Sequence, residues 1–218
     1  LAEATDADVY LGGTATGLQD FDLITSSRLP LLALALSVFT FLVLIFVLRS
    51  LLLPLMAVAF NLLTVAAAIG VTVFFFVGDN PILGGPGFID AITVFGIFGI
   101  MFGLSIDYEV FLLLRMREGY DLTGSTKEAI EYGVERTAGV ITGAALIMTV
   151  VFLSFSTADI SAAKQLGVAL SVAVIVDATL IRLVLLPGAM RLCGRANWWL
   201  PRPLKTLLGP SPTAAQES

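Results

Sequence analysis

Five long apolar stretches, separated by short polar segments, dominate the chain. Each has about 20 residues or more, which is enough for a helix to cross the roughly 30 Å hydrocarbon core of a bilayer. The stretches cover residues 29–48, 52–77, 91–114, 138–157 and 165–186. This pattern predicts an all-α integral membrane fold, with a five-helix transmembrane bundle over residues 29–188.

A very short connection joins the first two stretches. Only Arg49, Ser50 and Leu51 separate them. Pro54 follows in the expected first turn of the second helix, where its missing N–H is tolerated. We therefore expect these two helices to form an antiparallel hairpin.

Positive charge is unevenly divided between the two ends of the expected bundle. Of the 12 Lys and Arg residues, only Arg28 and Lys164 fall on one side. The other side receives Arg49, Arg115, Arg117, Lys127, Arg136, Arg182, Arg191, Arg195, Arg202 and Lys205. Because Lys and Arg are enriched in cytoplasmic loops, we expect a protein of the cytoplasmic membrane, with its N-terminus outside and its tail, residues 189–218, in the cytoplasm.

Two polar segments are expected to have structure of their own. Residues 1–28 contain the strand-like run DVYLGG and a helical stretch after it, which indicates the end of an external soluble domain. Further along, Ser125 and Glu128 form a capping-box pattern. An apolar stripe follows at Ala129, Ile130, Gly133 and Val134. We expect an amphipathic helix near residues 125–137 that lies on the cytoplasmic membrane surface.

Composition supports the membrane assignment and narrows the chemistry. Hydrophobic residues make up 57% of the chain and charged residues 13%, with a mean hydropathy of +0.96. Cys193 is the single cysteine and there is no histidine, which excludes an internal disulfide, a His-based metal site and an imidazole relay. No Walker-type glycine loop for ATP is present. We expect no metal and no cofactor, so any proton chemistry must use carboxylates.

The third stretch carries an aspartate in an apolar run. Residues 94–115 read VFGIFGIMFGLSIDYEVFLLLR, and Asp107 near a helix centre costs roughly 2.5–3.5 kcal/mol. At about 100° per residue, Asp107 shares one stripe with Gly96, Gly99 and Gly103. Glycines on such a stripe let another helix approach closely. We therefore expect Asp107 to face protein rather than lipid, either as a proton carrier or as a buried polar tie.

The fifth stretch contains two charges, Asp177 and Arg182. In an α-helix a spacing of five residues places their side chains about 140° apart, so we do not expect them to pair directly. Arg182 instead either meets Glu109 of the third stretch or extends to the cytoplasmic interface. Asp177 is a second candidate for ion or proton chemistry.

Hydroxyl groups recur on the fourth stretch. Thr142, Thr149 and Ser156 are spaced at steps of seven and therefore share one helical face. They either line a polar path between helices or bond to backbone carbonyls. Tyr108, beside Asp107, has a hydroxyl that can donate to a carboxylate of a neighbouring segment.

Three runs of the sequence resemble a known family of transporters. They are GLSIDYEVFLLLRMREGYDLTGSTKEAIEYGVERTAGVITGAALIM, KQLGVALSVAVIVDATLIRLVLLPGAM and NWWLP. These runs look like the C-terminal half of transporters of the mycobacterial membrane protein large (MmpL) family, in the resistance-nodulation-division (RND) superfamily. The similarity extends over residues 9–203 and is most specific in DYEVFLL and DATLIRL.

The resemblance implies twelve membrane spans in two halves, each with an external α/β porter domain after its first span. Residues 1–28 then match the end of the second porter domain, and the five stretches match spans eight to twelve. The implied activity is secondary active transport, in which protons drive the export of lipids or other hydrophobic molecules. The family's relay uses an Asp–Tyr pair from each half. Asp107 and Tyr108 match this pair, and Asp177 and Arg182 match its supporting residues.

This implied function depends on partners outside the chain. The second Asp–Tyr pair belongs to an N-terminal half that the chain lacks. Because the sequence begins at Leu1, we also expect it to be a piece of a longer polypeptide. The expected partners are that half, protons and a lipid or other hydrophobic substrate. No nucleic acid is expected, and a homo-oligomer stays open.

Two other classes of membrane protein also place acids in membrane helices. An intramembrane aspartyl protease uses two aspartates, as Asp107 and Asp177 could be, but GLSID departs from the GxGD pattern of those enzymes. We therefore expect no enzyme activity. A sterol-sensing-like lipid-binding module without transport is the closer alternative, and it would not require Asp107 to titrate.

Overall fold

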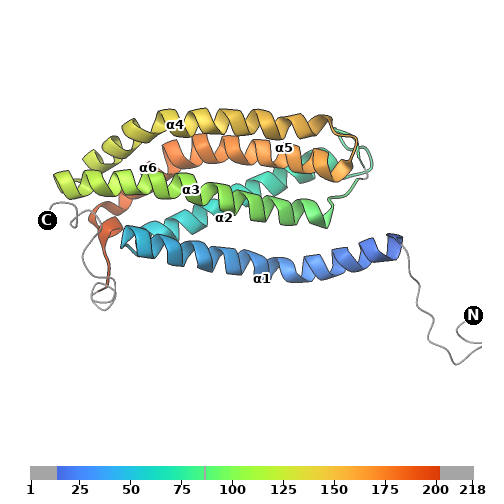
Figure 1. The fold of residues 1–218 in the computed structure, drawn as a ribbon, viewed down its shortest axis with the longest axis horizontal. Coiled ribbons are helices and arrows are strands. Elements are labelled where there is room, and N and C mark those ends of the chain that lie inside the picture. Colours follow the sequence, from blue (N-terminus) through green and yellow to red (C-terminus); the bar gives the residue numbers. More distant parts are fainter. Residues whose placement is uncertain (1–13, 86, 202–218) are drawn as a thin grey trace, which may run out of the picture.

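A computed structural model describes residues 14–85 and 87–201, with side chains described from residue 27 onward. The five longest elements are the α-helices α1 (Thr14–Leu48), α2 (Leu52–Phe76), α3 (Ala91–Thr123), α4 (Thr126–Ser154) and α5 (Ser161–Val176). A π-helix, η2 (Asp177–Leu185), and then α6 (Leu186–Cys193) continue the line of α5. Short 3₁₀ turns follow α4 and α6, namely η1 (Phe155–Thr157) and η3 (Gly194–Trp198). Figure 1 shows the long helices side by side, with their connections at two opposite ends.

Five helices in the described part of the chain are long and apolar enough to cross a membrane. Their bounds are Ser27–Leu48, Leu52–Phe76, Ala91–Thr123, Thr126–Thr157 and Ser161–Trp198. The five-helix all-α membrane bundle expected from the sequence is therefore confirmed. The strand-like run within residues 1–28 falls among residues 1–13, which lie outside the described residues, and residues 14–28 belong to α1.

One end of the bundle gathers the α1–α2 turn, the α3–α4 turn and the end of the described chain. The Leu51 N–H donates to the Trp199 carbonyl (3.2 Å), and the Ser50 hydroxyl donates to the Asn197 carbonyl. Trp198 Nε1 donates to Thr126 Oγ1 (3.0 Å). At the opposite end, Gln165 Nε2 donates to the Phe88 carbonyl (2.8 Å). The predicted antiparallel hairpin of α1 and α2 is thus present and is tied to the C-terminal segment.

The segment 125–137 differs from the expected surface helix, because it forms the first part of α4. Ser125 caps α4 by accepting from the Glu128 N–H (3.5 Å), as the capping-box pattern predicts. The apolar stripe is buried at Ala129, Ile130 and Gly133. It packs against the extension of α3, since a Cβ at Gly133 would overlap Met116. A missing Cβ at this position therefore lets α3 and α4 approach closely.

The buried interior has two apolar clusters. One includes Leu44, Leu53, Leu112, Met116 and Trp198, and the other includes Val65, Ile97, Phe102 and Leu170. Buried polar side chains lie between the clusters along the same helices, at Asn61 of α2, at Ser105 and Glu109 of α3, and at Asp177 and Arg182 of η2. A polar layer thus interrupts an otherwise apolar core.

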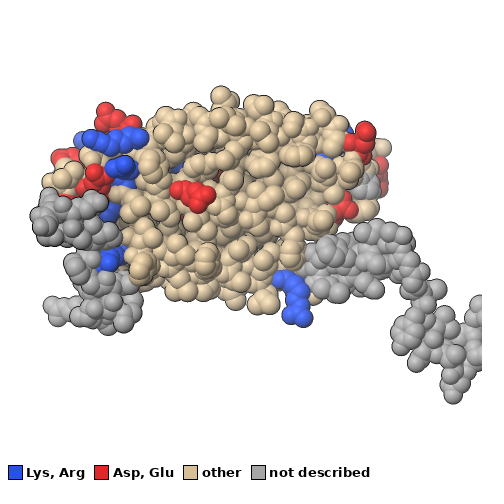
Figure 2. All heavy atoms as spheres, in the orientation of Figure 1, with Lys and Arg blue, Asp and Glu red and all other residues tan. Residues whose placement is uncertain are grey.

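The outer surface also has a layered character. Figure 2 shows a broad band of uncharged residues with most charged side chains at its two ends, and with one acidic group inside the band on this face. Many Lys and Arg side chains on this face lie at the end that holds the α3–α4 turn. Large apolar side chains such as Leu42, Phe46 and Val150 are exposed on the band. This distribution suits a bundle surrounded by lipid.

Candidate functional site

An ion pair joins Asp177 and Arg182 inside the bundle. Arg182 Nε donates to Asp177 Oδ2 at 2.8 Å, and the two side chains are only 3% (Arg182) and 8% (Asp177) exposed. Our expectation that they do not pair was wrong, because η2 is a π-helix, in which residues five apart lie above one another. Arg182 therefore stays in the interior and does not extend to the cytoplasmic interface.

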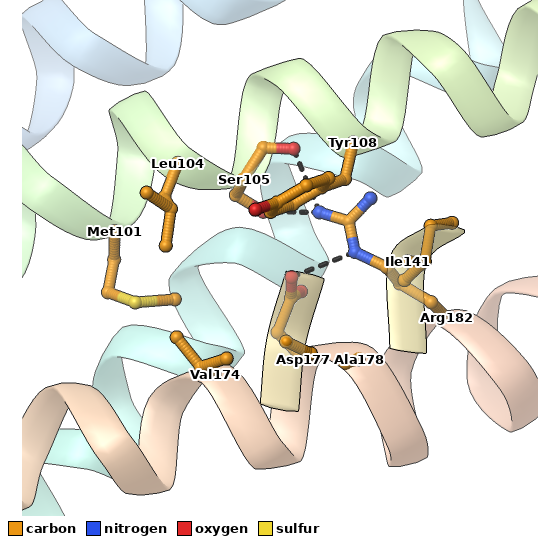
Figure 3. A pocket seen from close by; sticks show the side chains of 10 residues that line it. Met101, Leu104, Ser105, Tyr108, Ile141, Val174, Asp177, Ala178 and Arg182 are labelled. Atoms are coloured by element: carbon orange, nitrogen blue, oxygen red, sulfur yellow. Dashed lines mark hydrogen bonds and ion pairs between the residues drawn. The ribbon is translucent and has the colours of Figure 1, made fainter. Parts of the chain in front are cut away.

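Arg182 also connects η2 to α3. Its Nη2 donates to the Ser105 carbonyl (2.8 Å) and to Ser105 Oγ (2.9 Å). The guanidinium lies 5.6 Å from the centre of the Tyr108 ring. Figure 3 shows these two side chains close to each other. A buried arginine with several hydrogen bonds and an aromatic face nearby compensates part of its desolvation cost.

Two further hydrogen bonds connect Ser105 to Glu109. Ser105 Oγ donates to Asn61 Oδ1 (2.6 Å), and Asn61 Nδ2 donates to Glu109 Oε2 (3.2 Å). Glu109 is only 4% exposed. Arg182 and Glu109 are thus linked through Ser105 and Asn61. Among the described residues we find no direct hydrogen bond between them.

Tyr108 lies at the edge of this polar layer. Its hydroxyl donates to Met148 Sδ of α4 (3.0 Å) rather than to a carboxylate. Tyr108, Ser105, Asp177 and Arg182 line a small cavity of about 10 Å³ between α3, α4 and η2 (Figure 3). A cavity of that size has room for about one water molecule, and its polar wall consists of hydroxyl, carboxylate and guanidinium groups.

Asp107 points away from the buried network. Its side chain is exposed in this chain, as are Gly99 and Gly103. A Cβ at either glycine would meet nothing within 4 Å, whereas a Cβ at Gly96 would lie 2.9 Å from Leu166 of α5. The expectation that Asp107 faces protein is therefore not met by the described residues. The stripe Gly99–Gly103–Asp107 is an open face of α3.

The hydroxyl face expected on the fourth stretch does not join the network. Thr142 is exposed, and Thr149 and Ser156 are half-buried. None of the three lines the cavity beside Asp177 and Arg182. The carbonyl of Thr149 instead accepts from Ser171 Oγ of α5 (3.4 Å).

The sequence reasoning missed Ser105 as a site residue and gave Asn61 little weight. One signal was available for Ser105. It lies four residues before Glu109, so both fall on one face of α3, opposite Asp107. Asn61 had no comparable signal, because a single amide in an apolar helix is also compatible with ordinary packing. Among the described residues no group of three or more potential metal-binding side chains occurs.

The chain is similar to proteins of one transporter family. The family model described as "MMPL family" matches residues 1–209. The chain is 43% identical over 205 residues to the heme uptake protein MmpL11 of Mycobacterium tuberculosis (strain H37Rv), covering 93% of this chain and 21% of the relative. It is 41% identical over 206 residues to the mycolic acid-containing lipids exporter MmpL11 of Mycolicibacterium smegmatis, covering 93% and 22%.

A third relative has a different name within the same family. The trehalose monomycolate exporter MmpL3 of Mycolicibacterium smegmatis is 38% identical over 201 residues, covering 91% of this chain and 20% of the relative. The chain therefore spans about a fifth of the length of these three relatives. Because the family model covers most of its residues, the chain belongs to the MMPL family.

Proposed function

We propose that this chain is part of a secondary transporter that uses the proton-motive force to export lipids or other hydrophobic molecules across the cytoplasmic membrane. Two of the relatives above are named as lipid exporters, of mycolic acid-containing lipids and of trehalose monomycolate. The third is named as a heme uptake protein, and heme is also largely hydrophobic. A hydrophobic cargo is common to these names.

The observation that carries the proposal is the buried ion pair of Asp177 and Arg182. Ionisable groups within membrane helices are costly, and they commonly mark ion or proton pathways. Here the pair lies next to Tyr108 and a cavity large enough for about one water.

Asp107 and Tyr108 form the second part of the proposed relay. Asp107 lies on the open glycine stripe of α3, and Tyr108 lies on the side that faces Arg182. We place the second Asp–Tyr pair of the transporter against this open stripe, on a helix from the N-terminal half of the same polypeptide. A proton taken up by Asp107 would then pass along Tyr108 toward Asp177 and Arg182.

Proton uptake and release give the transporter two states. Neutralising Asp107 weakens its polar contacts with the facing helix, and release restores them. Because helix packing responds to such a change, the two halves shift relative to each other, and the porter domains alternate their access to the cargo. We place the porter side outside and the C-terminal tail in the cytoplasm, supported by the Lys and Arg at that end.

The experiment uses the full transporter in proteoliposomes with an imposed pH gradient. Lipid export and proton movement are followed together, with and without a proton ionophore. We expect lipid to move only while the gradient exists, with protons moving in the opposite direction. Lipid binding without either flux would instead support a lipid-binding module without transport, and flux that ignores the ionophore would contradict proton coupling. The same assay with heme as cargo tests the uptake direction.

A further inference from the structure

Three side-chain hydrogen bonds of the buried polar layer donate in one direction, from Arg182 toward Glu109. Arg182 donates to Ser105, Ser105 donates to Asn61, and the Asn61 amide donates to Glu109. A guanidinium can only donate, whereas an ionised carboxylate can only accept. Glu109 is therefore the acceptor at the end of a chain of donors that begins at Arg182, and this arrangement suits its ionised form.

Asn61 can reverse its direction in the chain without breaking it. A side-chain amide presents a donor on one side and an acceptor on the other. If a proton binds Glu109 Oε2, the new O–H requires an acceptor where Asn61 now offers its Nδ2. Rotation of the amide by about 180° supplies that acceptor and turns the Nδ2 donor toward Ser105 Oγ.

That rotation changes the hydrogen bonds of Ser105. In the present arrangement the Ser105 O–H donates to Asn61, whereas in the rotated arrangement Ser105 Oγ would accept from Asn61 and its O–H would be released. Asp177 Oδ1 is buried and has no hydrogen-bond partner among the described residues. Ser105 and Asp177 line the same cavity, so the released O–H has a carboxylate oxygen available there.

We propose that Asn61 and Ser105 are positioning residues that couple the protonation of Glu109 to the Asp177–Arg182 ion pair. This inference rests on the proposed proton relay and adds a second branch to it, on the side of α3 opposite Asp107. Among the described residues, the charged groups that act on Glu109 are Arg182 and Asp177 of η2. Tyr108 is the next residue on α3. No bond other than that of the transferred proton forms or breaks, because Asn61 and Ser105 only exchange hydrogen-bond partners.

Infrared difference spectroscopy on the full transporter in lipid nanodiscs tests the coupling without a transport assay. Spectra at high and low pH are compared for the wild type, Glu109→Gln and Asp177→Asn. Each variant lacks one carboxyl group, so the band missing from its spectrum is assigned to that group. We expect the Asp177 band to change together with the protonation of Glu109. In Asn61→Leu the Glu109 band should persist while the linked change at Asp177 is lost.

The midpoint of the Glu109 band gives a second readout. Without Asn61 the ionised form of Glu109 loses one hydrogen-bond donor and is destabilised. The midpoint of the Glu109 band should therefore move by about one pH unit to the alkaline side. Thr64→Val is the matched control, since Thr64 lies on α2 and, among the described residues, its hydroxyl donates to the Phe60 carbonyl (3.1 Å) and not to the network. Its midpoint should equal that of the wild type.

Ser105→Ala keeps the test decisive if Asn61→Leu does not fold. It removes the hydroxyl between Asn61 and Arg182, and it should also abolish the linked change at Asp177. An Asp177 change that persists in both variants would overturn the inference. This outcome is distinct from failure of the proposed function, which would appear as a wild-type protein that moves lipid without protons.

Discussion

Arg182 and Asp177 form a direct ion pair at 2.8 Å although they are five residues apart in one helix. An α-helix would place their side chains about 140° apart, but the π-helical segment Asp177–Leu185 aligns them. π-Helical segments are rare and occur frequently at functional sites. The π-helical geometry therefore pairs the charge of Arg182 with that of Asp177. It also directs the guanidinium toward Ser105 and Tyr108.

Removing only one partner of this pair should destabilise the protein strongly. Arg182→Met leaves Asp177 buried without its cation, and breaking a buried pair in this way costs about 3–5 kcal/mol. Thermal unfolding of the purified transporter in detergent measures the loss. Arg182→Lys should recover stability only in part, because an ammonium does not reproduce the planar arrangement of donors to Asp177 and Ser105.

The double variant Asp177→Leu and Arg182→Met is the informative control. It removes both charges, so it should unfold at a higher temperature than Arg182→Met alone. Its proton-coupled transport should still be absent, since no titratable pair remains in η2. Transport at the wild-type rate by the stable double variant would show that the pair serves packing alone.

Much of the architecture could be predicted from local patterns, because those patterns act locally. The lengths of the apolar stretches predicted the five spans, and the pattern of Ser125 and Glu128 predicted the start of α4. The segment 125–137 was not predicted to be the first part of α4. Its apolar stripe is the same whether it meets lipid or another helix, and the extension of α3 to Thr123 provides a helix for it to contact.

The candidate site was less accessible to sequence reasoning, because it depends on geometry that the sequence does not display. The angle of about 140° between Asp177 and Arg182 applies to an α-helix. The residues of DATLIRL do not indicate a π-helix, which the structure has at this point. The glycine stripe correctly grouped Gly99, Gly103 and Asp107 on one face. It did not tell which helix covers that face, since the described part of this chain leaves the face open.

The open glycine stripe of α3 should tolerate a large side chain in the bundle itself but not in transport. A Cβ at Gly103 meets nothing within 4 Å, and leucine has a higher helix propensity than glycine. Gly103→Leu should therefore unfold at or above the wild-type temperature and yet transport poorly, because the leucine blocks the facing helix. Proteoliposome transport and thermal unfolding are measured on the same preparation.

Two glycine variants calibrate that result. A Cβ at Gly70 would also meet nothing within 4 Å, and Gly70 lies on α2 rather than on the stripe of Asp107, so Gly70→Leu should retain transport. Gly133→Ala should be destabilised by about 1–3 kcal/mol, because its Cβ overlaps Met116. If Gly103→Leu transports at the rate of Gly70→Leu, no helix packs on the stripe and the placement of the N-terminal half is incorrect.

Membrane sidedness can be tested with single cysteines. Asp79 lies in the exposed loop after α2, and Lys127 is exposed near the start of α4. Cysteines are introduced one at a time at these positions in a background with Cys193→Ser and any other cysteines replaced. An impermeant thiol reagent added to whole cells should label Asp79→Cys and leave Lys127→Cys unlabelled until the cells are opened. The reverse pattern would invert the proposed orientation.

The most direct test of the central claim concerns Asp107. Asp107→Asn keeps the size and polarity of the side chain but cannot release a proton near neutral pH. Proton uptake and lipid export are measured together, in proteoliposomes containing the full transporter, under an imposed pH gradient. We predict that Asp107→Asn loses both fluxes while it unfolds at the wild-type temperature. Unchanged fluxes in this folded variant would make Asp107 a structural tie and would contradict the proposed relay.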